Sequence, residues 1–166
     1  MAVMNKNIQW QVKSFNDLTN NELYDVLKLR IDVFVVEQTC YYPDLDNKDR
    51  HKDTLHLFSY LPPSTASCSE NNEISSYLRI VGIGQSYDEY ISIGRVVIAP
   101  KARGTGLGHK LMKEALSVCQ QYFPEQKIKI SAQEHLEKYY NQHGFVRVSD
   151  MYLEDDIPHI AMVEKK

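Results

Sequence analysis

The stretch Arg103-Gly104-Thr105-Gly106-Leu107-Gly108 decides the fold, because it places three glycines at alternate positions just before an amphipathic helix. The segment Ile91–Ile98 before it is nearly continuous in isoleucine and valine, as in a strand buried on both faces. A helix start carries backbone N–H groups without partners and a partial positive charge, and glycines let a ligand approach it closely. With the forked donors of Arg103, the stretch predicts a seat for a phosphate or pyrophosphate.

Other phosphate-binding motifs fit this turn less well. A P-loop needs lysine and then serine or threonine directly after its last glycine, whereas Gly108 is followed by histidine, lysine and leucine. The dinucleotide fingerprint follows its strand directly, whereas five residues separate Ile98 from Gly104. The alternative at this point is a glycine-rich helix cap that binds nothing.

Hydrophobic periodicity predicts the elements on either side of the turn. It predicts seven strands, at Ile8–Phe15, Leu55–Leu61, Tyr77–Gly84, Tyr90–Ile98, Lys127–Ala132, Phe145–Leu153 and His159–Glu164. It predicts three helices, one from about Asn20 to just before Thr39 with a bend near Asp32, and two over Gly106–Gln121 and Glu134–His143. Residues 62–76 are rich in Pro, Ser, Asn and Glu and predict a mobile loop. This order indicates one domain over residues 1–166, an α/β sandwich with a mixed central sheet of about seven strands and helices on both faces.

The composition is that of a globular domain and excludes several classes of function. The 166 residues suffice for one core, and a net charge of −3 lacks the basic excess of a nucleic-acid binder. No apolar run approaches the roughly 20 residues that span a bilayer, and residues 1–10 show no signal-peptide pattern. Cys40, Cys68 and Cys119 form no Cys-x-x-Cys pair, so we expect free thiols, no metal site and a reducing, cytoplasmic location.

Two elements together resemble the GNAT superfamily of N-acyltransferases. Gly94–Gly108 resembles the family's motif A, a strand ending near a proline and then Arg/Gln-x-x-Gly-x-Gly/Ala, with Arg103, Gly106 and Gly108 at the defining places. Tyr140-Asn141-Gln142-His143-Gly144-Phe145 resembles the family's Tyr-x-x-x-Gly-Phe element and follows the expected strand. The pair of elements at this separation is much more specific than either one.

Most of the remaining chain resembles the ElaA-like subgroup of this family, whose substrate is undefined. Stretches spread from the first helix to the last strand carry this resemblance: Val33-Phe34-Val35-Val36-Glu37-Gln38, Tyr42-Pro43-Asp44-Leu45-Asp46, Asp49, His56-Leu57, Arg79 and Ile157-Pro158-His159-Ile160. Residues 62–76 look like an insertion relative to that subgroup.

The resemblance implies a site for coenzyme A. In this family the fourth and fifth strands splay apart, and the pantetheine arm lies in the gap and pairs with the fourth strand. Backbone groups at 96–98 would then bind pantetheine, and residues 103–108 would hold the pyrophosphate. The residues implied for acetyl-CoA are Val96, Val97, Ile98, Arg103, Gly104, Thr105, Gly106, Leu107, Gly108, Gln133 and Tyr140.

The implied activity is transfer of an acetyl group from acetyl-CoA to a primary amine of a small molecule or peptide, by direct attack on the thioester. The resemblance places the Val97 backbone N–H at the oxyanion, which needs a donor pointed at it. Tyr140 matches the acid that protonates the leaving thiolate, a role typically worth about 10² to 10⁴ in rate. The alternative for Tyr140 is an amphipathic tyrosine packed beside Tyr139.

The expected fourth strand carries no candidate for the general base. Some family members place a glutamate there, but Tyr90–Arg95 contains no carboxylate. Candidates elsewhere are Glu37, His56 and His159. We prefer His159, because its strand should border the acceptor cleft and histidine is easily poised near neutral pH. The expected catalytic residues are Tyr140, His159 and Glu37.

Three aspartates, Asp44, Asp46 and Asp49, lie in the polar loop expected to flank the acceptor site. Their carboxylates would attract a cationic amine to the cleft. The alternative is that they cap turns and face water, as loop acids commonly do. The sequence leaves both readings open.

Two other functions stay open at this stage. A non-catalytic acyl-CoA-binding or protein-interaction module on the same fold would account for the missing strand carboxylate. A phosphate-ester enzyme could use the same glycine turn, but the chain lacks a catalytic lysine–serine pair and an acidic metal cluster. We expect an amine substrate, no nucleic-acid or membrane partner, and a monomer or homodimer.

Overall fold

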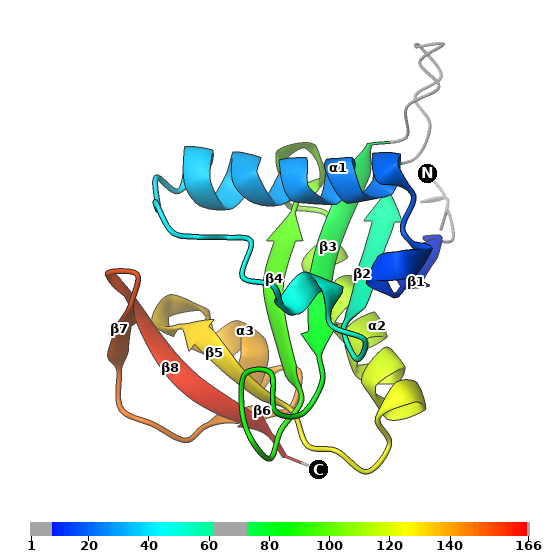
Figure 1. Cartoon of the computed structure of the whole chain (residues 1–166). Coiled ribbons are helices and arrows are strands. Elements are labelled where there is room, and N and C mark those ends of the chain that lie inside the picture. Colours follow the sequence, from blue (N-terminus) through cyan, green and yellow to red (C-terminus); the bar gives the residue numbers. More distant parts are fainter. Residues whose placement is uncertain (1–7, 62–72, 166) are drawn as a thin grey trace, which may run out of the picture.

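The N-terminal half of the chain builds an antiparallel sheet. The structure is a computed structural model that describes residues 8–61 and 73–165. Strands β1 (Trp10–Lys13), β2 (Leu55–Tyr60), β3 (Ile74–Val81) and β4 (Ser92–Ile98) pair in chain order (Figure 1). All eight residues of β3 are buried, which places this strand at the centre of the layer.

The C-terminal part forms a second sheet around the long strand β8 (Ile157–Glu164). β5 (Lys129–Gln133) pairs with one edge of β8, and β6 (Phe145–Arg147) and β7 (Tyr152–Glu154) pair with it as well, all antiparallel. The prediction of one central sheet of about seven strands was therefore wrong, because the described residues form eight strands in two sheets. The strand expected over 145–153 is two short strands, β6 and β7.

Strand boundaries differ from the expectation where side chains are buried by long-range pairing. β3 begins at Ile74, inside the expected loop, because Ile74 is buried and pairs with Tyr60. The rest of that loop, 62–72, lies outside the described residues, as does Cys68. β8 begins at Ile157, because Asp155 and Asp156 adopt positive φ and close a two-residue hairpin turn with β7.

Helix α1 (Asn20–Arg30) begins at the capping box that the sequence predicts. The Thr19 hydroxyl accepts from the Glu22 backbone N–H at 3.1 Å, and the Glu22 carboxylate accepts from the Thr19 N–H at 2.9 Å. The helix continues as a π-helical segment, Ile31–Glu37, where the sequence predicted a bend near Asp32.

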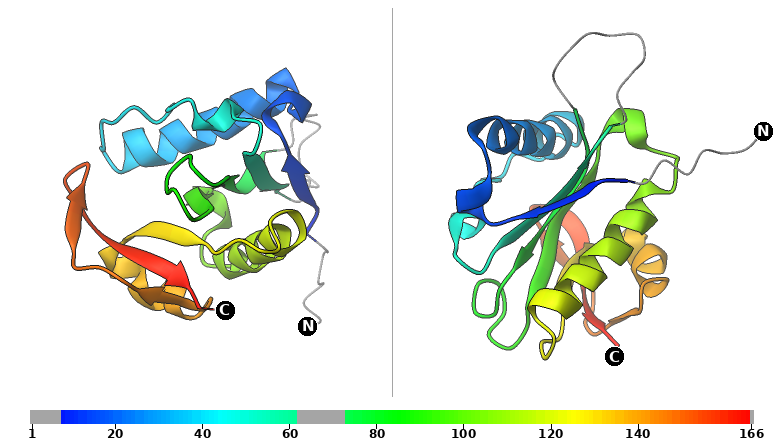
Figure 2. Two further views of the ribbon diagram at one scale, coloured as in Figure 1. Left: turned by 60° about the horizontal axis from the view of Figure 1, so that its bottom comes forward. Right: turned by 90° about the vertical axis from the view of Figure 1, so that its right-hand side faces the viewer.

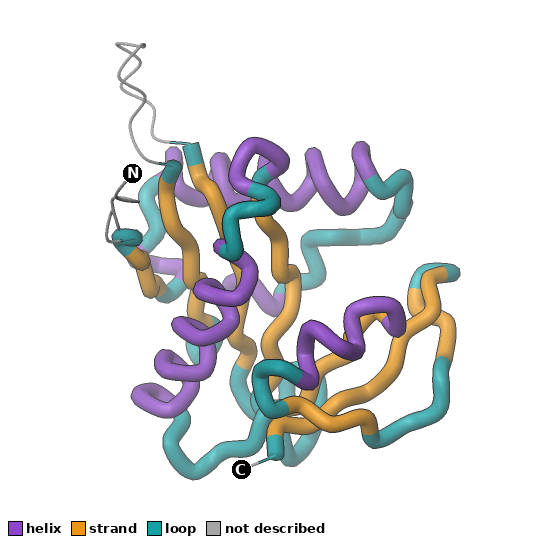
Figure 3. Tube along the Cα trace, turned by 180° about the vertical axis from the view of Figure 1, so that it is seen from behind, coloured by secondary structure: helices purple, strands orange, loops and turns teal. Residues whose placement is uncertain are grey.

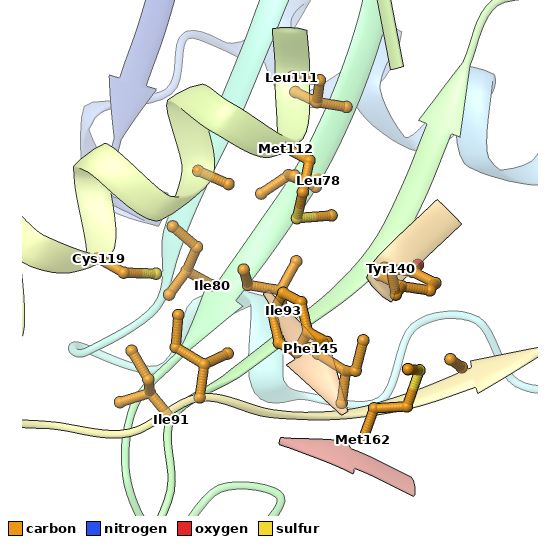
Figure 4. Close-up of a cluster of buried hydrophobic side chains, with 14 of the residues drawn as sticks. Leu78, Ile80, Ile91, Ile93, Leu111, Met112, Cys119, Tyr140, Phe145 and Met162 are labelled. Carbon is orange, nitrogen blue, oxygen red and sulfur yellow. The ribbon is translucent and has the colours of Figure 1, made fainter. Parts of the chain in front are cut away.

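The two long helices cover opposite faces of the first sheet (Figure 2). α2 (Leu107–Tyr122) buries its apolar stripe in the larger core, together with β3 and β5 (Figure 4). α1 contributes Val26 to a second core on the other face. The short helix α3 (Glu137–Asn141) lies beside the second sheet on the same side as α2, as the view from behind shows (Figure 3). Helices on both faces are thus confirmed.

Two irregularities shape the middle of the molecule. β4 contains a bulge, where the register with β3 shifts and Arg95 adopts a φ of 54°. β4 approaches β5 only at its N-terminal end, through a parallel bridge between Ile91 and Ile128. Ile91 donates to the Lys127 carbonyl at 3.1 Å and accepts from the Lys129 N–H at 3.0 Å. Beyond this bridge the two strands continue in different sheets.

Candidate active site

A pocket of about 510 Å³ lies between the two sheets. One wall consists of β3, β4 and the loop that follows the π-helical segment, and the other of β5, β8 and the β7–β8 turn. Of the residues expected to be functional, Val96, Gln133, Tyr140 and His159 line this pocket. The structure therefore brings together residues from β4, β5, α3 and β8 that are far apart in the sequence.

The glycine turn lies at the opposite end of β4 from the Ile91 bridge and has the geometry of an anion seat. Gly104 and Gly106 have φ of 76° and 77°, and a Cβ built on either would have no atom within 4 Å. The turn thus needs glycine for its conformation and leaves open space over its backbone. Gly106 is the N-cap of α2, so unpaired N–H groups of the first helical turn begin here. These residues fit a pyrophosphate.

Tyr139 ties this turn to α3. Its hydroxyl donates to the Gly108 carbonyl at 2.7 Å, and its ring contacts His109 at a centroid distance of 5.0 Å. His109 Nδ1 lies 2.9 Å from His143 Nε2, so α2 and α3 are held together beside the turn. Burial raises the pKa of Tyr139 to about 12. The sequence did not single out this contact.

Arg103 and Glu37 form a bidentate ion pair. Arg103 donates to the two Glu37 oxygens at 2.7 and 3.1 Å, and both side chains are more than two-fifths exposed. Hydrogen bonding from Arg103 lowers the pKa of Glu37 below its usual value. Glu37 does not line the pocket. A carboxylate with a lowered pKa, outside the pocket, is poorly suited to take a proton there, so the geometry does not favour Glu37 as the base.

Tyr140 is buried on α3 and faces the pocket. Its ring meets Phe145 edge to face at a centroid distance of 5.9 Å (Figure 4). It also meets Tyr139 edge to face, at 4.9 Å. Burial raises the pKa of the Tyr140 phenol, which keeps the hydroxyl protonated at neutral pH. Its hydroxyl makes no hydrogen bond within residues 8–61 and 73–165 and is available to a ligand.

The backbone of β4 between the bulge and the glycine turn has one strand partner. Val97 and Ile98 pair with β3, and among the described residues no strand pairs with the other edge of this segment. The Val97 side chain belongs to the core beneath α1, and Val96 packs against the core beneath α2. The Ile98 carbonyl accepts from Arg103 Nε at 3.3 Å, so that group is already engaged.

The three aspartates of the polar loop form ion pairs with arginines, and Asp46 and Arg79 of this network line the pocket. Arg30, which is fully buried, binds Asp44 at 2.9 Å and Asp49 at 2.7 Å. Arg79 pairs with Asp49 at 2.9 Å and also with Asp46. Asp44 and Asp49 are buried, so the alternative in which these two carboxylates face water does not hold. Because their charges are balanced by arginines, they do not form a free acidic surface either.

Arg95, at the bulge of β4, joins the same network. Its Nε lies 2.8 Å from Asp44 Oδ1, as an ion pair without hydrogen-bond alignment, and its NH2 donates to the Asp44 carbonyl at 3.0 Å. Its guanidinium also lies over the Tyr42 ring at 5.1 Å. The loop is therefore attached to the bulge through one side chain.

His56 is a structural member of this network. Its Nδ1 lies 2.8 Å from the Tyr77 hydroxyl and its Nε2 lies 2.9 Å from the Asp49 carbonyl. Burial lowers the pKa of His56 below its usual value. With both ring nitrogens engaged and 1% of the residue exposed, His56 is not placed to act as a base.

The second-sheet wall of the pocket carries Ser131, Glu154 and His159, which form a polar cluster with Tyr152 behind them. Ser131 donates to Glu154, and its oxygen lies 2.6 Å from the Tyr152 hydroxyl. His159 Nε2 lies 4.0 Å from Glu154 Oε2. Only His159 was expected from the sequence. The pair Asp155-Asp156 is the signal that could have revealed Glu154, because a two-residue turn there sets Glu154 opposite Ile157.

Two absences hold for the part of the chain that the structure describes. No group of three or more His, Cys, Asp or Glu side chains there has the arrangement of a metal site. No helix there is long and apolar enough to span a bilayer.

Comparison with known proteins agrees with this geometry. Residues 68–166 match the family described as "Acetyltransferase (GNAT) domain". Protein ElaA of Escherichia coli is 35% identical over 95% of this chain and 97% of its own length, and a UPF0039 protein of Schizosaccharomyces pombe is 39% identical over 94% and 96%.

Solved structures agree over the same extent. The crystal structure of an acyl-CoA N-acyltransferase from Pseudomonas aeruginosa superposes with a TM-score of 0.85 and 41% identity, covering 95% of this chain and 99% of that one. E. coli ElaA superposes with a TM-score of 0.83 over the same shares of each chain. The chain therefore belongs to the GNAT acetyltransferase family, and its resemblance to ElaA is confirmed.

Proposed function

We propose that this protein is an acetyl-CoA-dependent N-acyltransferase that moves an acetyl group to a primary amine of a small molecule or peptide. The observation that carries the proposal is the position of Tyr140. Its hydroxyl faces a pocket that also borders β4, and β4 leads directly into the anion seat at residues 103–108. Family membership supports an acyl-CoA as the donor.

The acyl-CoA would lie where β4 and β5 part. In the register that pairs Val97 with Tyr77, Ala99 donates to the Ser75 carbonyl, so the backbone groups of Val97 point to β3 and the free edge of β4 offers the Val96 carbonyl and the Ile98 N–H. The glycine turn offers N–H groups with open space over Gly104 and Gly106. Gln133, at the end of β5, lines the pocket from the other side. The Val97 N–H, which the sequence resemblance implied as donor to the developing oxyanion, points instead to Tyr77 of β3, so that donor has to come from another group of the site.

Two proton transfers are needed, one at each side of the reacting carbon. Tyr140 holds its proton at neutral pH and donates it to the leaving sulfur. His159 lines the acceptor side of the same pocket and takes the proton that the amine loses. We propose His159 as the general base, since Glu37 pairs with Arg103 and His56 is buried.

The decisive experiment is an assay of free thiol released from acetyl-CoA in the presence of a broad panel of primary amines. We expect amine-dependent release well above the hydrolysis background for at least one acceptor class, with the acetylated amine confirmed by mass spectrometry. Release that no amine stimulates would contradict the proposal.

A second candidate is a non-catalytic acyl-CoA-binding module, favoured by the absence of a carboxylate on β4. It predicts binding of acetyl-CoA by calorimetry without transfer to any amine. Calorimetry and the thiol assay together separate it from the enzyme.

A further inference from the structure

The polar cluster of the second sheet places a carboxylate beside a histidine, an arrangement suited to accepting a proton. His159 on β8 lies opposite Gln133 of β5 on one side and Tyr152 of β7 on the other. Glu154 is two residues beyond Tyr152 and therefore points to the same face. The sheet thus places Tyr152, Glu154 and His159 on one face, where Glu154 and His159 line the pocket.

The contact of His159 Nδ1 fixes which nitrogen can accept a proton. Nδ1 lies 2.7 Å from the Ile157 carbonyl oxygen. A carbonyl oxygen only accepts, so Nδ1 carries the hydrogen and the neutral ring has its lone pair on Nε2. Nε2 is 4.0 Å from Glu154 Oε2, which is too far for a hydrogen bond. The lone pair on Nε2 is therefore free to receive a proton.

Glu154 is held in place to act on that nitrogen. Its carboxylate accepts from the Ser131 hydroxyl, which in turn meets the Tyr152 hydroxyl at 2.6 Å. The Tyr152 ring stacks on the His159 ring, with an interplanar angle of 21° and a centroid distance of 6.3 Å. The Glu154 carboxylate is thereby held with Oε2 4.0 Å from His159 Nε2.

The other charged groups around the pocket lie farther from the His159 ring than Glu154 does or are paired with one another. Asp155 and Asp156 lie in the β7–β8 turn, and Cys40 contacts that turn from across the pocket mouth. The opposite wall carries Arg79 and Arg95, which pair with Asp46 and Asp44, and Lys48, which donates to Ser86. Tyr140 faces the pocket as a neutral phenol. Among the described residues, only Glu154 places a carboxylate within 4.0 Å of the imidazole.

We infer that Glu154 is a positioning residue that stabilises His159 when its Nε2 takes the proton of the acceptor amine. This inference rests on the proposed function and supplies the carboxylate that β4 lacks. As the C–N bond forms and the C–S bond breaks, the nitrogen loses one proton to His159 Nε2 and the sulfur gains one from Tyr140. Both side chains then return to their starting states by exchange with water.

The first test needs no turnover. Nitrogen chemical shifts of the His159 ring, measured by NMR on the intact protein at a pH where the ring is neutral, report which nitrogen carries the hydrogen. We expect a protonated Nδ1 and an unprotonated Nε2. A hydrogen on Nε2 would overturn the inference, whatever the assay of acetyl transfer shows.

The second test compares two neutralised carboxylates in the same hairpin. In Glu154→Gln we expect the acid limb of the kcat/KM profile to move to lower pH by roughly half a unit or more, because the imidazolium loses its counter-charge. Asp156→Asn removes a charge two residues from Glu154 and keeps a residue type that tolerates positive φ. The acid limb of the kcat/KM profile of this variant should therefore stay at the wild-type pH. His159→Gln should lower kcat/KM about 10²-fold.

The outcomes separate the inference from the function on which it rests. Equal shifts in Glu154→Gln and Asp156→Asn, or no shift in either, would overturn the assignment of Glu154 while acetyl transfer stands. Absence of transfer in the wild type would contradict the proposed function, and the NMR measurement would still decide the state of His159.

Discussion

Tyr140 and Tyr139 are neighbours in sequence with opposite tasks. The Tyr139 hydroxyl is engaged with the Gly108 carbonyl, whereas the Tyr140 hydroxyl faces the pocket. Successive residues of a helix point about 100° apart, so one short helix can hold the anion seat with one side chain and offer a proton with the next. The sequence resemblance indicated only the second task.

The first prediction concerns Tyr140 itself. Tyr140→Phe removes the proton donor and leaves the buried ring, so kcat should fall tenfold or more with little change in folding stability. Steady-state rates of thiol release, with a thermal melt of each variant, measure both. Tyr122→Phe is the matched control, since Tyr122 lies on α2, is 50% exposed and does not line the pocket. An unchanged kcat in Tyr140→Phe would remove Tyr140 from the acid role.

At the scale of elements, the glycine turn shows why three similar residues are not equivalent. Gly106 has positive φ as the N-cap of α2, whereas Gly108 lies inside the first turn of that helix. A Cβ on Gly108 would meet Ile98 Cγ1 at 3.8 Å and the Tyr139 hydroxyl at 3.9 Å, which are ordinary contacts. Backbone conformation requires glycine at Gly106, whereas helix propensity disfavours glycine at Gly108.

The second prediction follows from that difference. Gly106→Ala should lower the free energy of unfolding by about 1 to 2 kcal/mol, because a side chain is strained at positive φ. Gly108→Ala should keep or raise stability, since alanine is the better helix former and its Cβ has room. Denaturant unfolding of the two variants measures the contrast. Equal destabilisation by both would contradict the conformational argument.

The ion network acts between elements, because it attaches the loop after the π-helical segment to β3 and β4. Burial alone would raise the pKa of Asp46, but hydrogen bonds and charge from Arg79 outweigh it and lower the pKa to about 2. The folded state therefore favours the ionised carboxylate. Its contribution is present above the unfolded pKa of about 4 and is lost as the pH falls through the folded value.

The third prediction tests that linkage. The unfolding free energy of the wild type should exceed that of Asp46→Asn by an amount that shrinks by about 2 kcal/mol between neutral pH and about pH 2. Urea unfolding of both proteins across this range gives the difference. Asp150→Asn, at an exposed site, should show no comparable change. A difference independent of pH would mean that the Asp46 charge contributes nothing to stability.

For the whole molecule, local patterns predicted what local forces determine. The capping box at Thr19, the apolar stripe of α2 and the glycine turn follow from nearest neighbours along the chain, and the structure has all three. The division into two sheets arises because β4 and β5 diverge directly after the Ile91–Ile128 bridge, which no pattern within either strand encodes. The sequence patterns therefore predicted one sheet where the structure has two.

The candidate site could also be predicted only in part. Tyr140 and the turn at 103–108 belong to short motifs, so their positions could be anticipated. Glu154 enters the pocket only because a two-residue turn sets β7 against β8. The burial of Asp44 and Asp49 depends on Arg30, which is on a helix and looks like a surface residue in the sequence. Such partners become visible only once the chain has folded.

The bridge between Ile91 and Ile128 has a consequence for cooperativity. Each sheet is built from its own part of the chain, β1–β4 before α2 and β5–β8 after it, so each half is a candidate unit for separate opening. Strand pairing connects the halves at one point. A ligand that contacts both walls of the pocket adds connections that the backbone lacks, and by mass action it stabilises the closed assembly over states with one half open. Bound donor would thus make the two halves unfold more nearly as one.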